Sequence, residues 1–161
     1  MLLCGCGAAH IKKITDAYNL GNYKNIYVAD VSVNSTEQKE DLVALNESFS
    51  KDAKEEIIRT LEKKTNYLLI DKPDQNVNQT LIIETEIKIA YGNRALRYFV
   101  GFGAGKGSVV STLRVKDNVS GGIKLELVSE SDLAVGIFGG DMRQVVKENI
   151  KKLADQLEKE L

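Results

Sequence analysis

The segment Arg94–Val115 reads RALRYFVGFGAGKGSVVSTLRV, and glycine occupies every second position from residue 101 to residue 107. In an extended chain alternate side chains lie on one face, so one face of this segment would carry no side chains. Either another part of the protein packs closely against that face or the backbone bends there. The residues that follow, Ser108–Val115, are rich in β-branched side chains, which predicts a strand. We therefore expect a glycine-rich loop or a bulged strand that leads into a regular strand.

The segment resembles two nucleotide-binding motifs in its glycine content but matches neither. A P-loop needs four residues between its first glycine and a Gly-Lys-Ser/Thr triplet, and a helix must follow. Here three residues separate Gly101 from Gly105, and a strand follows, so no helix N-terminus is offered to a phosphate. The spacing also departs from the G-x-G-x-x-G dinucleotide motif. Nucleotide binding is therefore not the function that we expect.

Hydrophobic periodicity along the chain predicts a single α+β domain. The expected strands are residues 25–33, 67–71, 80–91, 108–115 and 122–130, and the expected helices are residues 45–64 and 141–161. The order is β-α-β-β-β-β-α, the sheet of about five strands is mainly antiparallel, and both helices cover one face. The last three strands form a meander. Residues 1–24 are expected to be a signal remnant and tether, with a marginal helix as the alternative for residues 8–22, and residues 25–161 form the domain.

The same patterns predict which side chains are buried. In the first strand the cleaner apolar face consists of Tyr27, Ala29, Val31 and Val33. In the strand of residues 80–91 the buried face consists of Ile83, Thr85, Ile87 and Ile89, whereas Glu84, Glu86 and Lys88 form a solvated face. In the last strand Ile123, Leu125 and Leu127 point inward. Ser50 is the expected N-cap of the first helix.

Composition agrees with a globular protein that buries a core. The chain has 161 residues, of which 43% are hydrophobic and 28% are charged. The net charge of −1 gives no bulk electrostatic attraction to nucleic acid, so we expect no nucleic-acid partner. No segment is apolar enough over 18 residues to be expected to cross a bilayer as a helix.

Both cysteines lie in the first segment, Met1–Ala9, which reads MLLCGCGAA. In one interpretation this is the end of a lipoprotein signal, with Cys6 lipidated, although a charged and apolar leader is missing before it. In a second, Cys4, Cys6 and His10 bind a metal, but they supply at most three ligands. In a third, the thiols are inert. We favour the first because only it explains the order of an apolar residue, a small residue, glycine and cysteine.

No catalytic constellation is evident in the sequence. The single histidine lies in the expected tether, and no Gly-x-Ser-x-Gly motif or Ser-His-Asp set can be assembled. Arg94, Arg97 and Lys106 flank the glycines, either as surface charges or as a small anion site with backbone N–H groups. We therefore expect no enzyme activity, no cofactor and no metal.

The segment Arg97–Asp117, together with Ser120, the Gly136–Gly140 run GIFGG and the closing helix, resembles a family of bacterial lipoproteins, Domain of Unknown Function 4410. The resemblance covers about Tyr27–Leu157. It implies a lipidated cysteine, matching Cys6, and an envelope location, and it implies no catalytic residues. A glycine after that cysteine resembles the sorting pattern for the outer membrane.

These observations lead to one expected function and one alternative. The expected function is that of a non-enzymatic, lipid-anchored envelope domain, on the outer membrane and facing the periplasm, that binds other proteins or itself. The residues expected to make the contact are Arg97, Tyr98, Gly101, Phe102, Gly103, Gly105, Lys106 and Gly107. The alternative is a soluble small-anion or nucleotide-binding module, or an enzyme, that uses residues 101–107.

Overall fold

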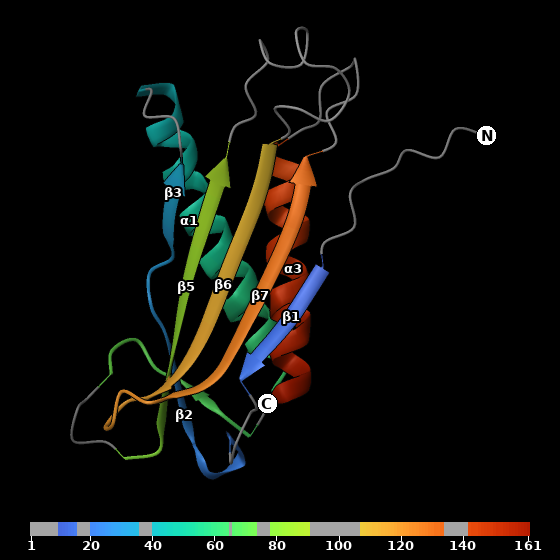
Figure 1. The fold of residues 1–161 in the computed structure, drawn as a ribbon. Helices are drawn as coiled ribbons and strands as arrows, with labels where there is room; N and C mark the ends of the chain where they lie inside the picture. Colours follow the sequence, from blue (N-terminus) through green and yellow to red (C-terminus); the bar gives the residue numbers. More distant parts are fainter. Residues whose placement is uncertain are drawn as a thin grey trace, which may run out of the picture.

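The described part of the protein forms a two-layer α+β domain, with one mixed seven-stranded sheet and two helices on one of its faces (Figure 1). The computed structural model describes residues 10–15, 20–35, 40–64, 66–73, 78–90, 107–133 and 142–161. The strands are β1 His10–Thr15, β2 Asn25–Val28, β3 Ser32–Ser35, β4 Leu68–Leu69, β5 Thr80–Ala90, β6 Gly107–Asp117 and β7 Ile123–Leu133. The helices are α1 Glu40–Leu61 and α3 Met142–Glu160, with a short 3₁₀ turn at Leu20–Asn22.

The sheet order is β1-β7-β6-β5-β2-β4, and β3 pairs with β5 beyond the end of β2. The pairs β5–β6, β6–β7 and β1–β7 are antiparallel, which confirms the predicted meander. Strands β2 and β3 run parallel to β5, and β4 runs parallel to β2. The predicted α+β class with two helices is therefore confirmed, but the sheet has seven strands rather than about five.

The meander forms because its strands alternate apolar and polar side chains over eleven residues each. In β5 the side chains of Ile83, Thr85, Ile87 and Ile89 are buried under the helices, as predicted. The opposite face carries most of the charges, and Glu84 there forms an ion pair with Lys116 of β6 at 2.5 Å. Next to this pair, Arg114 donates to Glu126 of β7 at 2.5 Å. The predicted solvated face is thus a set of cross-strand ion pairs.

The prediction for residues 25–33 is wrong in two respects. The strand breaks after Val28, and the buried side chains of β2 are Ile26 and Val28, not those of Tyr27 and Ala29. Val28 pairs with Ile83, and Ser32 pairs with Glu86. The chain thus takes four residue steps from Val28 to Ser32, while β5 takes three from Ile83 to Glu86. One extra residue reverses the alternation, and Val31 is buried only because of this shift.

The interpretation of residues 8–22 as a tether or marginal helix is wrong for residues 10–15. These residues form β1, which extends the sheet beyond β7. Lys13 donates to Glu160 at 2.9 Å and so ties β1 to the end of α3. Leu20, in the following turn, is buried in the core at 3% exposure. A strand with two adjacent lysines gives no alternating apolar signal, so its pairing depends on the neighbouring strand.

Two smaller predictions are also wrong. Helix α1 begins at Glu40, so Ser50 is not an N-cap, and its hydroxyl donates to the Val31 carbonyl at 2.5 Å from inside the helix. Ile123 is 45% exposed rather than inward, because the register between β6 and β7 shifts at Val115 and Lys116. Both errors come from contacts with other elements.

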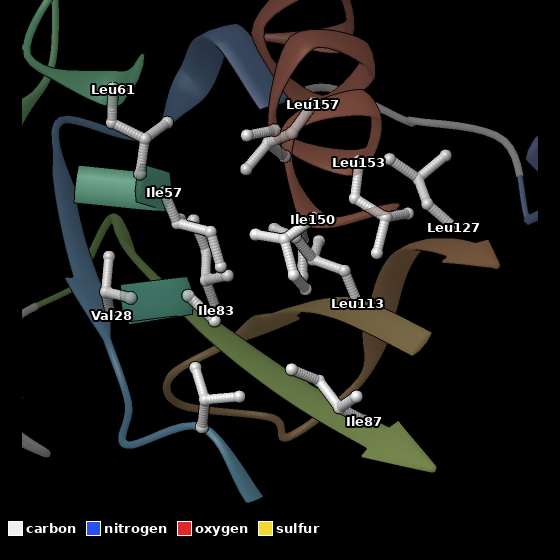
Figure 2. Close-up of a cluster of buried hydrophobic side chains, with 14 of the residues drawn as sticks. Val28, Ile57, Leu61, Ile83, Ile87, Leu113, Leu127, Ile150, Leu153 and Leu157 are labelled. Carbon is white, nitrogen blue, oxygen red and sulfur yellow. The ribbon is translucent and has the colours of Figure 1, made fainter. Parts of the chain in front are cut away.

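The core lies between the sheet and the helices. Figure 2 shows Ile57 and Leu61 of α1 and the side chains of α3 converging on β5 and β6. The side chains of α3 that are fully buried or nearly so are Val146, Asn149, Ile150, Leu153, Ala154 and Leu157, which lie on one face of the helix. Among the described helices, none combines the length and the hydropathy that crossing a membrane requires.

Candidate functional site: the helix layer and the two ends of the sheet

Most of the residues expected to act in function lie outside the described residues. These are Cys6, Arg97, Tyr98, Gly101, Phe102, Gly103, Gly105 and Lys106. Gly107 is described and lies buried at the first position of β6, opposite Leu133 of β7. His10 is the first residue of β1, while Cys4 lies outside the described residues. Within the part of the chain that the structure describes, no group of three His, Cys, Asp or Glu residues could hold a metal ion.

The strands nevertheless show where the glycine-rich segment connects. Strand β5 ends at Ala90 and β6 begins at Gly107, and these strands pair side by side, with Ala90 opposite Ser108. Strand β7 ends beside them at Leu133. We call the sheet end formed by Ala90, Gly107 and Leu133 the loop end; it lies at the top of Figure 1. The glycine-rich segment therefore leaves and re-enters the sheet at the loop end.

The opposite end of the sheet, at the turn Asp117–Gly122, is called the hairpin end. Asp117 accepts a hydrogen bond from the Tyr23 hydroxyl at 2.6 Å through Oδ2. Its Oδ1 accepts hydrogen bonds from the backbone N–H groups of Val119 and Ser120 at 3.1 Å and 2.7 Å, and from the Ser120 hydroxyl at 2.8 Å. Gly121 has a φ of +67°, a backbone conformation that suits glycine.

The shifted pKa values of Asp117 and Tyr23 indicate that the two side chains have a structural role. The hydrogen bond from Tyr23, followed by those from Ser120 and Val119, lowers the pKa of Asp117 to about 2. Burial, and then the hydrogen bond to Asp117, raises the pKa of Tyr23 to about 12. Both pKa values move away from neutrality, so neither group is suited to exchanging protons at pH 7. Asp117, which belongs to the segment that carries the family resemblance, thus closes a turn.

The helix layer carries a groove of about 650 Å³ between α1 and the first half of α3. The apolar side chains that line it are Phe49, Ala53, Val146 and Ile150. Its α1 wall is acidic, with Asp52, Glu55 and Glu56, although Arg59 also lies there and pairs with Glu56. Its α3 wall is basic, with Arg143 and Lys147. The two walls therefore have opposite charge.

Beyond the groove the charge difference continues on α3 but not on α1, whose exposed charges are mixed, with Glu47, Asp52 and Glu55 beside Lys51 and Arg59. The exposed residues of α3 are Arg143, Gln144, Lys147, Lys151 and Lys159, so every exposed charge on this helix is positive. The acidic residues of α3 are half-buried; Glu158 pairs with Lys63 at 3.8 Å. Arg143, Lys147 and Lys151 recur at intervals of four residues and so form one row, which we call the cationic ridge. Sequence periodicity identified the helix, but not this separation of charge, because burial of the acids depends on the fold.

The arrangement is that of a small domain with one sheet face open and one covered by two charged helices, and solved bacterial proteins share this fold. PelC from Paraburkholderia phytofirmans, solved as a dodecamer, is 14% identical with a TM-score of 0.53, covering 94% of this chain and 98% of that chain. A putative neuraminyllactose-binding hemagglutinin homolog from Helicobacter pylori is 12% identical with a TM-score of 0.54, covering 91% and 86%. At these identities the likeness shows the fold alone.

The family follows from the sequence. The family described as Domain of unknown function (DUF4410) matches residues 25–142, so the chain belongs to it. This confirms the family to which the glycine-rich segment pointed. No curated protein matches the chain.

Proposed function

We propose that this protein is a non-enzymatic, lipid-anchored domain of the bacterial cell envelope that assembles with further copies of itself. The anchor is an acylated Cys6, and the protein faces the periplasm from the outer membrane. The contact between copies places α3 of one copy on α1 of the next. The observation that carries the proposal is the charge difference between the basic α3 wall and the acidic α1 wall of the groove.

The charges select the kind of contact. If α3 met α3 of a second copy, the cationic ridges would face each other and repel. If α3 meets α1, Lys147 and Lys151 of one copy lie near Asp52 and Glu55 of the next. Such a head-to-tail contact repeats and closes into a ring or grows into a filament. The shared fold with PelC, whose solved structure is a dodecamer, supports assembly of this kind.

The edges of the sheet are less suited to the contact. Edge strand β1 carries Lys12 and Lys13, and lysines on an edge strand oppose pairing with a second sheet. The other edge consists of β3, with the sequence SVNS, and the two-residue β4. Both are short, which also limits strand addition. The glycine-rich segment, with Tyr98 and Phe102, remains a predicted second contact with other envelope proteins.

Two measurements test the proposal. Metabolic labelling with an alkyne fatty acid should label the wild-type protein and not Cys6→Ser, and an unlabelled wild type would contradict the anchor. Native mass spectrometry of the detergent-solubilised protein should show one defined oligomer larger than a dimer. A monomer at micromolar concentration, or a dimer that persists in high salt, would contradict the head-to-tail contact.

A further inference from the structure

The position of β1 relates the proposed anchor to the rest of the fold. Strand β1 is antiparallel to β7, and its first residue, His10, pairs with Glu130. Glu130 lies three residues before the end of β7 at Leu133. The N-terminal end of β1 therefore points toward the loop end of the sheet, which Figure 1 shows at the top.

The chain between the anchor and the sheet is short. Only Gly7, Ala8 and Ala9 separate Cys6 from His10. Four Cα steps span at most about 14 Å in a fully extended chain. By comparison, β6 has eleven residues, and such a strand spans about 34 Å. A cysteine held in the lipid headgroups can thus be close to the loop end, but not at the same time to the hairpin end unless the domain lies flat.

The domain could lie flat on the membrane with either its open sheet face or its helix face against the lipid, and the charges on both faces disfavour this. The open face of the sheet carries half-buried ion pairs such as Arg114–Glu126 and Lys116–Glu84, which would have to leave water if this face lay against a bilayer. The helix face presents the cationic ridge next to the acidic α1 wall, so attraction to an anionic surface is opposed by repulsion of Asp52 and Glu55. That face suits a second copy better, since a second copy complements both charges.

We infer that the spacer of three residues holds the loop end of the sheet at the lipid surface, with the hairpin end pointing away from it. The loop end therefore faces the membrane to which Cys6 is anchored, and envelope proteins that contact the glycine-rich segment would lie at that membrane surface. This inference rests on the proposed acylation of Cys6. It goes beyond the proposed function because it assigns a membrane-facing end to the fold.

The orientation also places two exposed apolar side chains, those of Val119 and Ile123, away from the lipid. Of the four large hydrophobic side chains exposed in the described part of the chain, Val119 and Ile123 lie at the hairpin end, with exposures of 60% and 45%. A protein that inserted its exposed apolar residues into the bilayer would turn this end toward it. A probe at Val119 therefore lies far from the lipid if the loop end faces the membrane, and close to the lipid if the hairpin end does.

The test uses the full acylated chain in vesicles of phosphatidylethanolamine, phosphatidylglycerol and brominated phosphatidylcholine. A bimane fluorophore is attached to one introduced cysteine, at Asp132→Cys for the loop end, Val119→Cys for the hairpin end or Lys151→Cys for the helix face. All three positions are exposed. Intact mass first establishes that each protein carries its acyl chains. Brominated lipid is expected to quench the fluorophore at residue 132 and to leave those at 119 and 151 unquenched.

The possible outcomes distinguish a failure of the proposed anchor from a failure of the proposed orientation. A protein without acyl mass overturns the proposed anchor and the orientation with it. An acylated protein quenched at 119 or at 151, and not at 132, retains the anchor and overturns the orientation. As a matched variant, ten Gly and Ser residues inserted between Ala9 and His10 keep the anchor but lengthen the spacer. Quenching at residue 132 should then be lost. If it persists, the short spacer is not what holds the loop end at the lipid surface.

Discussion

Reversal of charge on one helix should abolish assembly, and a mixture of two opposite reversals should restore it. The first variant, Lys147→Glu with Lys151→Glu, replaces the two central cations on the exposed face of α3 by anions and leaves Arg143 and Lys159 unchanged. The second, Asp52→Lys with Glu55→Lys, makes the exposed face of α1 positive. In a head-to-tail contact each variant alone brings like charges together at every interface. An equal mixture instead alternates the variants, so that every interface again joins opposite charges.

The expected magnitude follows from the exposure of these side chains. Lys147, Lys151, Asp52 and Glu55 are all exposed, so each pair across the interface contributes roughly 0.2–1 kcal/mol. Reversal replaces an attraction by a repulsion of similar size. Two reversals then weaken one interface by about 2 kcal/mol, or about 30-fold in its dissociation constant. The effect should shrink in 1 M salt, where the Debye length is about 3 Å.

Native mass spectrometry over a concentration series measures this effect, and thermal unfolding checks that each variant is folded. Reversal of Glu55 breaks its weak pair with Lys51, at 3.9 Å, which should cost at most about 0.5 kcal/mol of stability. The control variant, Lys24→Glu with Lys72→Glu, changes net charge equally at exposed positions away from the helices. The reasoning is refuted if the α3 variant assembles like the wild type, or if two folded monomeric variants stay monomeric when mixed.

Three further predictions concern other parts of the chain. Gly103→Val should weaken capture of envelope partners or the yield of folded protein, as pull-down and thermal unfolding would show; no change in either removes the glycine-rich segment as a contact. The lowered pKa of Asp117 should stabilise the protein above pH 4, and this stability should be lost as the pH falls from about 4 toward 2. Asp117→Asn should therefore cost about 1 kcal/mol at pH 7 and little at pH 2 in urea unfolding, whereas an equal cost at both pH values would contradict the linkage. The Ser111 hydroxyl is buried without a hydrogen-bond partner among the described residues, so Ser111→Ala should leave stability unchanged or raise it by up to about 1 kcal/mol; a loss of that size would indicate a bound partner such as water.

The parts of the fold that sequence predicts well are those in which a local pattern and the tertiary structure agree. The alternation in Thr80–Ala90 and the apolar stripe of Met142–Glu160 each bury one face against the same core. Such a pattern predicts the element correctly in any fold that buries one face of the strand or helix and leaves the other in water. The antiparallel pairing of the meander was predictable from the same alternation, and a short turn also joins β6 to β7, although sixteen residues separate β5 from β6.

The parts that were missed depend on distant residues. Strand β1 has no apolar alternation of its own and is held by β7 and by the Lys13–Glu160 ion pair. The buried face of β2 follows from one extra residue opposite β5, which no periodicity within Asn25–Val33 reveals. The positive exposed face of α3 was missed because this helix has nearly balanced charge in sequence, and only folding leaves its acids half-buried. The candidate contact residues from Arg97 to Lys106 stay a prediction from sequence.

The anchor and the charge separation constrain each other. If the loop end of every copy rests on the same membrane, the symmetry that relates the copies must keep all loop ends on one side. A two-fold axis parallel to the membrane places the anchors on opposite sides and is therefore excluded. A rotation axis perpendicular to the membrane is allowed, and it brings one side of each copy against the other side of its neighbour. Contact between unlike surfaces is also what the charges require, since α3 repels α3 and attracts α1. The proposed orientation and the proposed contact, although argued from different residues, thus require the same class of assembly, a ring that stands on its loop ends.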